Sequence, residues 1–351
     1  MTRRFGIPLV DAATQLQREQ VAYPTEKTQP LPTPTAAAPY RVTPTELGFA
    51  DPTDTLTLHV IGDHGGISDP NPQIAVVAAM VAAHAVHPVD ACYSVGDCGY
   101  FFGENSVYVP QFAEPYAHYN APIIGIPGNH DGDTSDNPAR LPLDAWMAHF
   151  CSSKAALLPG EEEYQRDTQT QPYCHWTLRA TLVTIIGAYS NVPSGGVIEP
   201  DQGAWIAGEL EAAPAGIPII LALHHPPLSC DAHHGGSAAM GEVIDRASVA
   251  ANRWPDMVLS GHVHSYQRLT RTVAGKQIPY IVCGASGYPN LHGMAPGIGK
   301  LPWQATTDTV LEAAVDSLYG FLTLTVSGGK ISGSYTTVSK AGAVVAGADT
   351  F

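Results

Sequence analysis

The sequence lacks an apolar run long enough to cross a membrane, which takes about 20 residues. Its longest apolar run, residues 74–86, has 13 residues and contains His84. Cationic residues are also scarce, because 17 Lys and Arg stand against 32 Asp and Glu and leave a net charge of −15. Such a charge repels polyanions and anionic lipid surfaces. The sequence therefore predicts a soluble protein that binds neither nucleic acid nor a membrane.

Cysteine pairs at the spacing of metal knuckles or redox dithiols are absent. The six cysteines include no C-x-x-C, which argues against both kinds of site, and their even number permits disulfides without requiring them. An export signal is not evident, because the apolar run after Arg3 and Arg4 stops at Asp11. We therefore expect a cytoplasmic protein with free thiols, with secretion from a longer natural chain as the alternative.

The chain is long enough to bury a large core without disulfide support. Its 351 residues are 44% hydrophobic, which is typical of a globular protein. Residues 1–50 differ, because six prolines between Pro24 and Pro44 interrupt a polar segment and disfavour a helix or a central strand. We expect an extended Pro-rich arm over residues 1–50 and one folded domain over residues 51–351.

Short apolar runs alternate with helical segments along the folded domain. The pattern predicts strands over residues 55–61, 91–95, 122–126, 181–186, 217–223 and 257–260, with helices over 73–84 and 203–212. After residue 278 it changes to short strands with Gly turns, over 280–283, 320–326 and 330–338. This alternation indicates an α/β fold, in which ligands bind beyond the carboxyl ends of the strands.

Five of the predicted strands end in side chains that can ligate a metal. These are Asp63, Asp97, Asn129, His224 and the pair His262 and His264. Each signal alone is weak, since Gly-Asp and Gly-His dipeptides are common in turns, but five in succession predict a shared site. Mixed carboxylate, amide and imidazole ligands suit two cations such as iron, zinc or manganese rather than calcium.

The order of these motifs resembles the calcineurin-like metallophosphoesterases and, more narrowly, the purple acid phosphatases. The resemblance covers about residues 55–340 and consists of Asp63-His64-Gly65, Gly96-Asp97-Cys98-Gly99-Tyr100, Gly128-Asn129-His130-Asp131, His224 and Gly261-His262-Val263-His264. It implies a four-layer α/β/β/α sandwich with two mixed β-sheets and a dinuclear metal centre at one sheet edge. It also implies hydrolysis of phosphate monoesters by a metal-bound hydroxide, so that residues 51–351 would be the catalytic domain.

The first motif departs from the broad superfamily at Gly65. The superfamily places a metal-binding His two residues after the first Asp, because side chains two apart on an extended strand point the same way. His64 is adjacent to Asp63 and should point elsewhere, so the first metal would be one ligand short. Tyr100, three residues past Asp97, supplies the missing donor in the purple acid phosphatase pattern. A phenol ionises readily only against a strongly acidic cation, which favours Fe(III).

The resemblance implies two ligand sets that share Asp97. The first would hold Fe(III) through Asp63, Asp97, Tyr100 and His264. The second would hold divalent Fe, Zn or Mn through Asp97, Asn129, His224 and His262. Beyond the ligands, the resemblance implies substrate-side roles for His130 and for His234, with His233 as the alternative to His234. Asp131 stands where the family usually has Glu, and its shorter side chain would reach His130 differently, which puts its orienting role in question.

The leading interpretation is a phosphatase that acts on small phosphorylated substrates. A phosphodiesterase or nucleotide hydrolase with two divalent ions would use nearly the same ligands, and only Gly65 and Tyr100 argue against it. A non-catalytic module that binds a partner through the Pro-rich arm is a third interpretation, but no ligand is lost. We expect structural roles for His225, Tyr266 and Arg268. The oligomeric state does not follow from the sequence.

Overall fold

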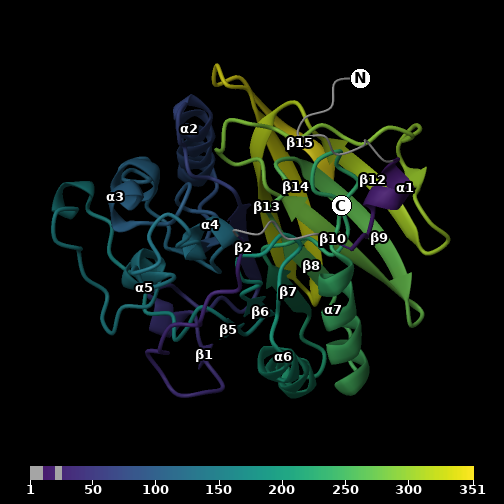
Figure 1. Cartoon of the computed structure of the whole chain (residues 1–351), viewed down its shortest axis with the longest axis horizontal. Coiled ribbons are helices and arrows are strands. Elements are labelled where there is room, and N and C mark those ends of the chain that lie inside the picture. Colours follow the sequence, from purple (N-terminus) through teal and green to yellow (C-terminus); the bar gives the residue numbers. More distant parts are fainter. Residues whose placement is uncertain (1–10, 20–25) are drawn as a thin grey trace.

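Two mixed β-sheets lie face to face at the centre of the structure (Figure 1). The structure is a computed structural model that describes residues 11–19 and 26–351. The Arg3-Arg4 pair and Pro24, which entered the predictions of an export signal and of the arm, lie outside the described residues.

The first sheet has six strands and contains the parallel strands β2, β3 and β4. Its order is β15 (Val344–Thr350), β14 (Lys330–Val338), β13 (Tyr319–Ser327), β2 (Thr55–Ile61), β3 (Ala91–Ser94) and β4 (Ile123–Gly125). The strands β13, β14 and β15 pair antiparallel and continue the sheet from β2. The carboxyl ends of β2, β3 and β4 therefore open at one edge.

The second sheet has nine strands, and β6, β7, β8 and β10 run parallel at its centre. Its order is β1 (Arg41–Val42), β5 (Trp176–Arg179), β6 (Thr184–Ala188), β7 (Ile219–Leu223), β8 (Met257–Ser260), β10 (Lys276–Cys283), β9 (Tyr266–Val273), β12 (Thr309–Val315) and β11 (Trp303–Gln304). The strands β9, β11 and β12 extend it by antiparallel pairing.

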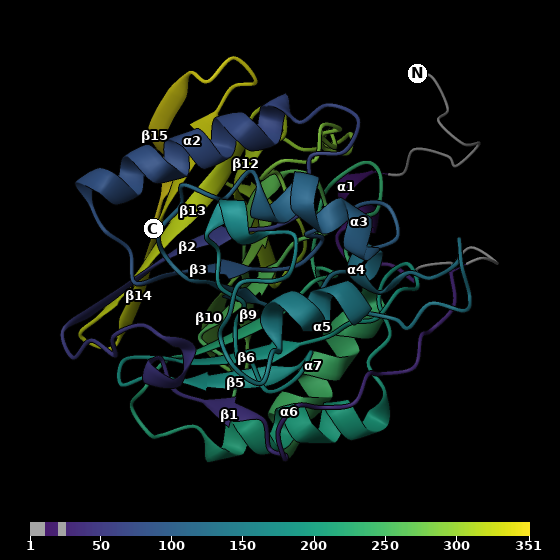
Figure 2. The same cartoon turned by 90° about the vertical axis from the view of Figure 1, so that its left-hand side faces the viewer.

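Helices cover the outer face of each sheet (Figure 2). Helix α2 (Asn71–Val86) packs on the six-stranded sheet, and α6 (Pro200–Ala212) and α7 (Ala238–Ala250) cover the nine-stranded sheet. The shorter helices are α1 (Ala12–Gln15), α3 (Asn105–Tyr108), α4 (Asn129–Gly132), α5 (Asp144–Phe150) and the turns η1 (Thr45–Leu47), η2 (Val109–Ala113) and η3 (Glu162–Tyr164). The predicted four-layer α/β/β/α sandwich is confirmed.

The core occupies the three spaces between these four layers. In β2, Val60 faces the opposite sheet while Ile61 faces α2; in β7, Ile220 faces the opposite sheet while Leu221 faces α6 and α7. Successive side chains of a strand point to opposite faces, so a strand between two layers is apolar on both. The near-continuous apolar runs of the central strands follow from this double burial.

The described part of the N-terminal segment is attached to the domain. Arg41–Val42 pairs with β5 as an edge strand, and the Thr35 backbone N–H donates to the Pro172 carbonyl over 3.1 Å. Ala12 and Leu16 of the α1 region are buried in the core beside α6 and α7. The expected arm is thus docked along much of its length, and the boundary near residue 50 stays a prediction.

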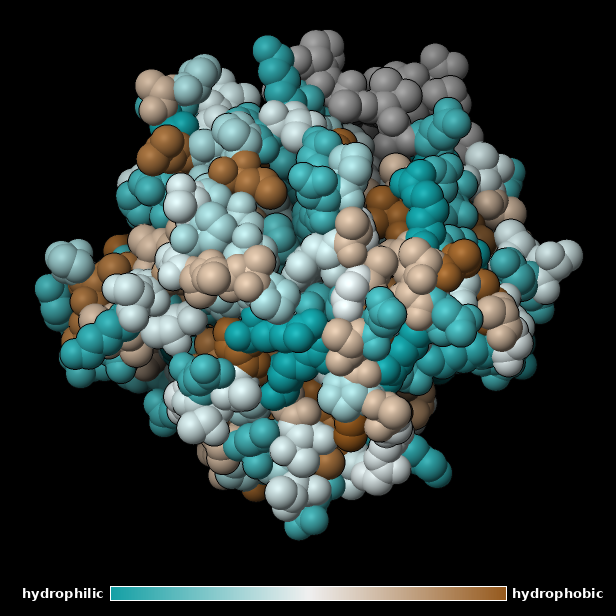
Figure 3. All heavy atoms as spheres, turned by 90° about the horizontal axis from the view of Figure 1, so that it is seen from below, coloured by the Kyte–Doolittle hydropathy of each residue, from teal (hydrophilic) through white to brown (hydrophobic). Residues whose placement is uncertain are grey.

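The surface that Figure 3 shows carries hydrophobic residues scattered among hydrophilic ones. Single exposed apolar side chains are common on protein surfaces. Within residues 11–19 and 26–351, no helix has the length and apolar character needed to cross a membrane.

A buried imidazole in β2 makes the stability of the fold depend on pH. The Nδ1 of His59 lies 2.8 Å from the Tyr119 hydroxyl, and burial lowers the pKa of His59 from 6.5 to about 4. Between these two pH values the unfolded chain takes up a proton at this residue and the folded chain does not. The free energy of unfolding should therefore fall as the pH drops from about 6.5 to about 4, by up to about 3 kcal/mol from His59.

We expect His59→Gln to reduce this dependence by the contribution of His59, because glutamine does not titrate. The measurement is urea unfolding at pH 7 and at pH 4.5 for the wild type and the variant. The exposed His87 gives the matched control, since His87→Gln should leave the pH dependence as in the wild type. Equal loss of stability on acidification in the wild type and in His59→Gln would contradict the assignment.

Candidate metal centre

The loops that follow the central strands of both sheets meet at one edge. The Asp63 N–H, after β2, donates to the Gly96 carbonyl, after β3, over 2.9 Å. Across the two sheets, the His262 N–H after β8 donates to Asp63 Oδ2 over 2.7 Å. The Gly261 N–H in turn donates to the His224 carbonyl over 2.9 Å. Backbone hydrogen bonds thus fix the ligand-bearing loops to one another.

Two of the predicted ligands lie beside one oxygen of a third, Asp63. The Tyr100 hydroxyl and His264 Nε2 each lie 3.4 Å from Asp63 Oδ1. The His264 Nδ1 donates to the Asn290 carbonyl over 2.9 Å, which leaves the Nε2 lone pair directed at Asp63. This grouping corresponds to the first predicted ligand set.

The second predicted set gathers around the Asn129 amide oxygen. Asn129 Oδ1 lies 3.0 Å from His224 Nε2 and 3.0 Å from His262 Nδ1, and Asp97 Oδ2 lies 3.3 Å from His224 Nε2. The His224 Nδ1 is 2.8 Å from the Val95 carbonyl, so this ring also presents Nε2 to the site. The structure therefore brings all seven predicted ligands together.

Two buried carboxylates at the centre lack a conventional cationic partner. Among residues 11–19 and 26–351, no Lys or Arg forms an ion pair with Asp63 or Asp97. Burial raises the pKa of Asp63 to about 7, and the Asp97 charge adds to this rise. Burial acts in the same direction on the pKa of Asp97, but His224 and His130 outweigh it and lower that pKa. Buried charges in proteins are paired or coordinate metals.

The imidazoles differ in their protonation. Burial alone would lower the pKa of His224, but the Asp97 and Asp63 charges raise it to about 9, so His224 carries a proton that a cation would displace. Burial lowers the pKa of His264 to about 4 and that of His262 well below its usual value. These two rings are neutral at pH 7, and each has a nitrogen lone pair that can coordinate a cation. Carboxylate, phenol, amide and imidazole donors together fit two borderline or hard cations.

Tyr100 occupies the space next to Gly65. A Cβ on Gly65 would lie 2.9 Å from Tyr100 Cδ2 and 2.6 Å from Gln111 Oε1, so no larger residue fits there. The Gln111 amide bonds both the N–H and the carbonyl of Tyr100, each over 2.9 Å, and fixes its backbone. His64 points away, with Nε2 3.0 Å from Ser94 Oγ. The Tyr100 phenol therefore lies beside Asp63, where the resemblance to purple acid phosphatases implies the missing donor.

The Tyr100 phenol keeps its proton unless a cation lies beside its oxygen. Burial raises its pKa well above the usual value of 10, and the charges of Asp97 and Asp63 add to the rise. Only a strongly acidic cation beside the phenol oxygen would lower this pKa enough to release the proton.

His130 lies beside the metal centre and is partly exposed. Its backbone N–H donates to Asp97 Oδ1 over 3.0 Å, and its ring Nδ1 is 2.7 Å from the Phe101 carbonyl. Its ring centroid lies 4.6 Å from that of Tyr100. With Nδ1 held by the carbonyl, Nε2 can face a substrate.

Asp131, whose orienting role toward His130 the sequence put in question, binds the backbone around Asp97. Its carboxylate accepts the N–H groups of Asp97 over 2.9 Å and of Gly128 over 2.8 Å, and the hydroxyl of Tyr108 over 2.9 Å. The His130 ring instead bonds the backbone of the next loop. The carboxylate thus joins its own loop to the loop after β3, and Asp131 is a positioning residue for Asp97. The doubt about its orienting role agrees with this geometry, since the Phe101 carbonyl holds the His130 ring.

The remaining predicted neighbours have structural contacts. His225 Nδ1 is 2.7 Å from Ser190 Oγ in the interior. Tyr266 donates to Asp349 Oδ2 over 2.8 Å, and Arg268 binds both oxygens of Asp349 over 2.7 and 2.9 Å. These contacts agree with the structural roles expected. All six cysteines are buried and unpaired with one another.

Several contacts of the site were not found from the sequence. The Tyr288 ring lies 4.4 Å from the Tyr100 ring and 4.5 Å from the His264 ring, and the His292 ring lies 4.2 Å from that of His264. Both residues belong to the loop after β10, which has no periodic pattern. Only the number of aromatic and imidazole side chains in residues 288–292 could have drawn attention to it.

The fold and this arrangement define a metallophosphoesterase. Residues 56–266, well over half of the chain, match the family model of the calcineurin-like phosphoesterases, and the chain belongs to this family. The family and the fold predicted from the motifs are thereby confirmed.

More narrowly, the chain is similar to purple acid phosphatases. It is 27% identical over 268 residues to purple acid phosphatase 22 of Arabidopsis thaliana, a match that covers 73% of this chain and 56% of the relative. In structure it is similar to purple acid phosphatase PPD1 from yellow lupin (Lupinus luteus) seeds, with a TM-score of 0.60 and 15% identity over 87% of this chain and 55% of that one. The chain thus spans a little over half the length of these two relatives.

A second solved structure shares the fold. GAP50, the anchor in the inner membrane complex of Plasmodium, has a TM-score of 0.57 and 14% identity to this chain, over 85% of this chain and 88% of that one. A likeness at this identity concerns the fold alone.

Proposed function

We propose that this protein hydrolyses phosphate monoesters at a dinuclear centre of one Fe(III) and one divalent Fe, Zn or Mn ion. The observation that supports it is the convergence of seven donor side chains. Two of them, Asp63 and Asp97, are buried carboxylates without a Lys or Arg partner among the described residues. Family membership and the similarity to purple acid phosphatases point to the same chemistry. A non-catalytic module of this fold would not need to keep all seven donors.

Two bound cations would neutralise the ester oxygens and lower the pKa of a nearby water molecule. The residues of the chain supply the rest. The buried hydrogen bonds from His264 to Asn290 and from His224 to Val95 orient two imidazoles before any substrate arrives. Asp131 holds the loop of Asp97 in place. This preorganisation means that little rearrangement is needed when a phosphate binds.

Two histidines serve the substrate rather than the metals. His130, held at Nδ1 by Phe101, presents Nε2 and would protonate the leaving group. His234 follows β7 in the loop held by Asp231, and its ring centroid lies 4.3 Å from that of His262. Its place beside a metal ligand favours His234 for contact with the phosphate.

The colour of the iron-loaded protein tests the Fe(III) assignment. A phenolate on Fe(III) absorbs visible light, whereas divalent zinc, magnesium or manganese at the same ligands would be colourless. We expect the oxidised, iron-loaded protein to be violet to pink. Tyr100→Phe should remove the band while Asp63, Asp97 and His264 still hold iron, as measured by absorption spectroscopy and elemental analysis.

Tyr288→Phe is the matched control. The Tyr288 ring centroid lies 4.4 Å from that of Tyr100, but Tyr288 is outside the predicted ligand set. It should leave the band unchanged. Iron-replete protein without visible absorption, or a band that survives in Tyr100→Phe, would contradict the assignment. That outcome would favour the phosphodiesterase with two divalent ions.

A further inference from the structure

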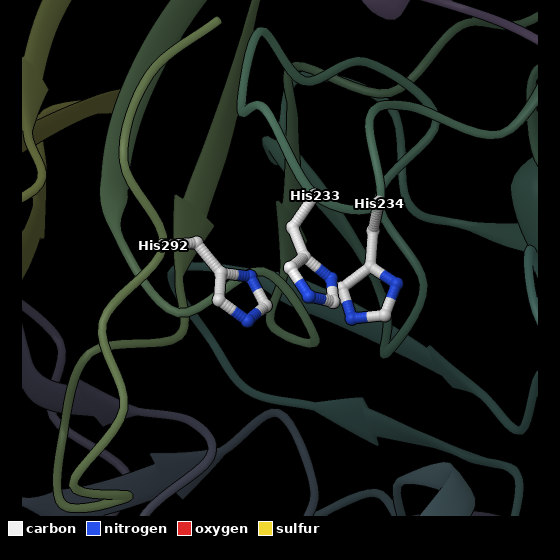
Figure 4. Close-up of side chains that lie close together, drawn as sticks. All are labelled: His233, His234 and His292. Carbon is white, nitrogen blue, oxygen red and sulfur yellow. The ribbon is translucent and has the colours of Figure 1, made fainter. Parts of the chain in front are cut away.

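Three histidines form a second cluster beside the metal centre. His233 and His234 lie in the loop between β7 and α7, and His292 lies in the loop after β10 (Figure 4). One ring nitrogen of each residue lies within 4.8 Å of the corresponding atoms of the other two. None of the seven ligands of the proposed dinuclear centre belongs to this cluster.

A buried carboxylate holds the cluster together. Asp231 is fully buried, and its Oδ2 accepts the backbone N–H groups of His233 over 2.8 Å and of His234 over 3.0 Å. The same Oδ2 lies 3.5 Å from Nδ1 of the His292 ring. For His292 this is the usual support of a metal-binding histidine, a carboxylate that orients the ring and raises its basicity.

The geometry is close to that of a bound transition metal. Zinc–nitrogen distances of about 2.0–2.1 Å place tetrahedral ligands about 3.3 Å from one another, so the three atoms must approach by about 1.5 Å at most. Rotation about χ2 of an imidazole is soft, and the His233 ring is exposed and can turn. The His233 and His292 rings now stack with centroids 4.6 Å apart, and this contact would open as His233 turns.

The His292 ring is fixed through its Nδ1. This atom accepts the backbone N–H of His264 over 3.3 Å and lies 3.5 Å from Asp231 Oδ2. An ion would therefore bind this ring at Nε2.

We propose that His233, His234 and His292 bind a third metal ion, a borderline divalent cation such as Zn²⁺, separate from the dinuclear centre. An all-imidazole site favours zinc, copper or nickel over magnesium and calcium.

Occupation of this site would inhibit the enzyme, an inference that rests on the proposed function. The His234 ring is next to His262 and the His292 ring next to His264, with centroids 4.3 and 4.2 Å apart. An ion bound there takes the His234 ring away from contact with the phosphate. Excess zinc should therefore reduce turnover.

The test counts zinc ions on the full-length, metal-loaded protein. Zn²⁺ is titrated in the presence of excess Mg²⁺, which occupies exposed carboxylates but binds imidazole poorly. The wild type should bind one Zn²⁺ per chain more than His233→Ala and one more than His292→Ala. Because His233 is exposed, its variant tests the site even where His292→Ala folds poorly. The exposed His87 provides the control, since His87→Ala should bind zinc as the wild type does.

The number of zinc ions bound per chain does not depend on turnover. If the dinuclear centre did not form, the wild type and every variant would bind fewer ions, but the wild type would still bind one ion more than either variant. Equal zinc binding by the wild type and both variants would overturn the proposal. Loss of the ion in His292→Ala but not in His233→Ala would also overturn the three-histidine site. In the activity assay, inhibition by excess zinc should disappear in both variants.

Discussion

Replacing His224 by alanine should lower the turnover of an activated aryl phosphate by more than about 10³-fold. His224 Nε2 lies 3.0 Å from Asn129 Oδ1 and 3.3 Å from Asp97 Oδ2, at the centre of the second ligand set. The variant loses a ligand from a preformed group of donors, so one metal ion should be lost while the fold remains. Asn129→Ala should behave in the same way. The measurements are kcat, metal content and the far-ultraviolet circular dichroism spectrum.

The neighbouring His225 provides a matched control. It is buried like His224, but its Nδ1 is bonded to Ser190 Oγ and belongs to neither ligand set. His225→Ala should therefore keep both metal ions, even where it lowers stability. Near-normal turnover of His224→Ala or Asn129→Ala, with both metal ions still bound, would exclude the second ligand set and with it the two-metal assignment.

His130→Ala should keep both metal ions and lose about 10²-fold to 10⁴-fold in turnover, the range for a positioned proton donor. The alanine variant retains the backbone N–H that donates to Asp97 Oδ1 over 3.0 Å, so the ligand loop should be undisturbed. Only the imidazole that Phe101 holds is removed. Alkyl phosphates should lose more than aryl phosphates, because a poor leaving group needs the proton most.

A series of substrates with leaving groups of different basicity separates two roles of His130. For a proton donor, the logarithm of kcat should depend more steeply on the leaving-group pKa in His130→Ala than in the wild type. Equal losses across the series would show that His130 binds the phosphate and donates no proton.

The central strands could be predicted because their burial on both faces requires near-continuous apolar runs in the sequence. The strands β2 (Thr55–Ile61) and β8 (Met257–Ser260) have the predicted bounds. The strand β5 (Trp176–Arg179) was missed, since it is short and includes Thr177 and Arg179. Arg179 binds the buried Glu209 over 2.9 Å, a tertiary contact that no local pattern indicates.

The convergence of the seven donor side chains could be predicted because each follows a strand within a short motif. The residues around them could not, since their contacts come from loops brought together by the fold. Gln111, which fixes the Tyr100 backbone, is 11 residues further along the chain, in η2. His292 and Tyr288 reach the site from the loop after β10. The role of Asp131 could not be predicted from the sequence either, because its position in the motif is the same whether its carboxylate supports His130 or Asp97.

Elemental analysis combined with an activity assay on one preparation tests the central claim most directly. Metal ions per chain are counted, and hydrolysis of p-nitrophenyl phosphate and of bis(p-nitrophenyl) phosphate is measured before chelation, after it, and after the metals are returned. We predict two ions of the dinuclear centre per chain, one of them iron, and preference for the monoester. Turnover should vanish with the metals and return with iron plus a divalent ion. A purified chain that binds no metal, or one that hydrolyses the monoester equally well without metal, would contradict the account.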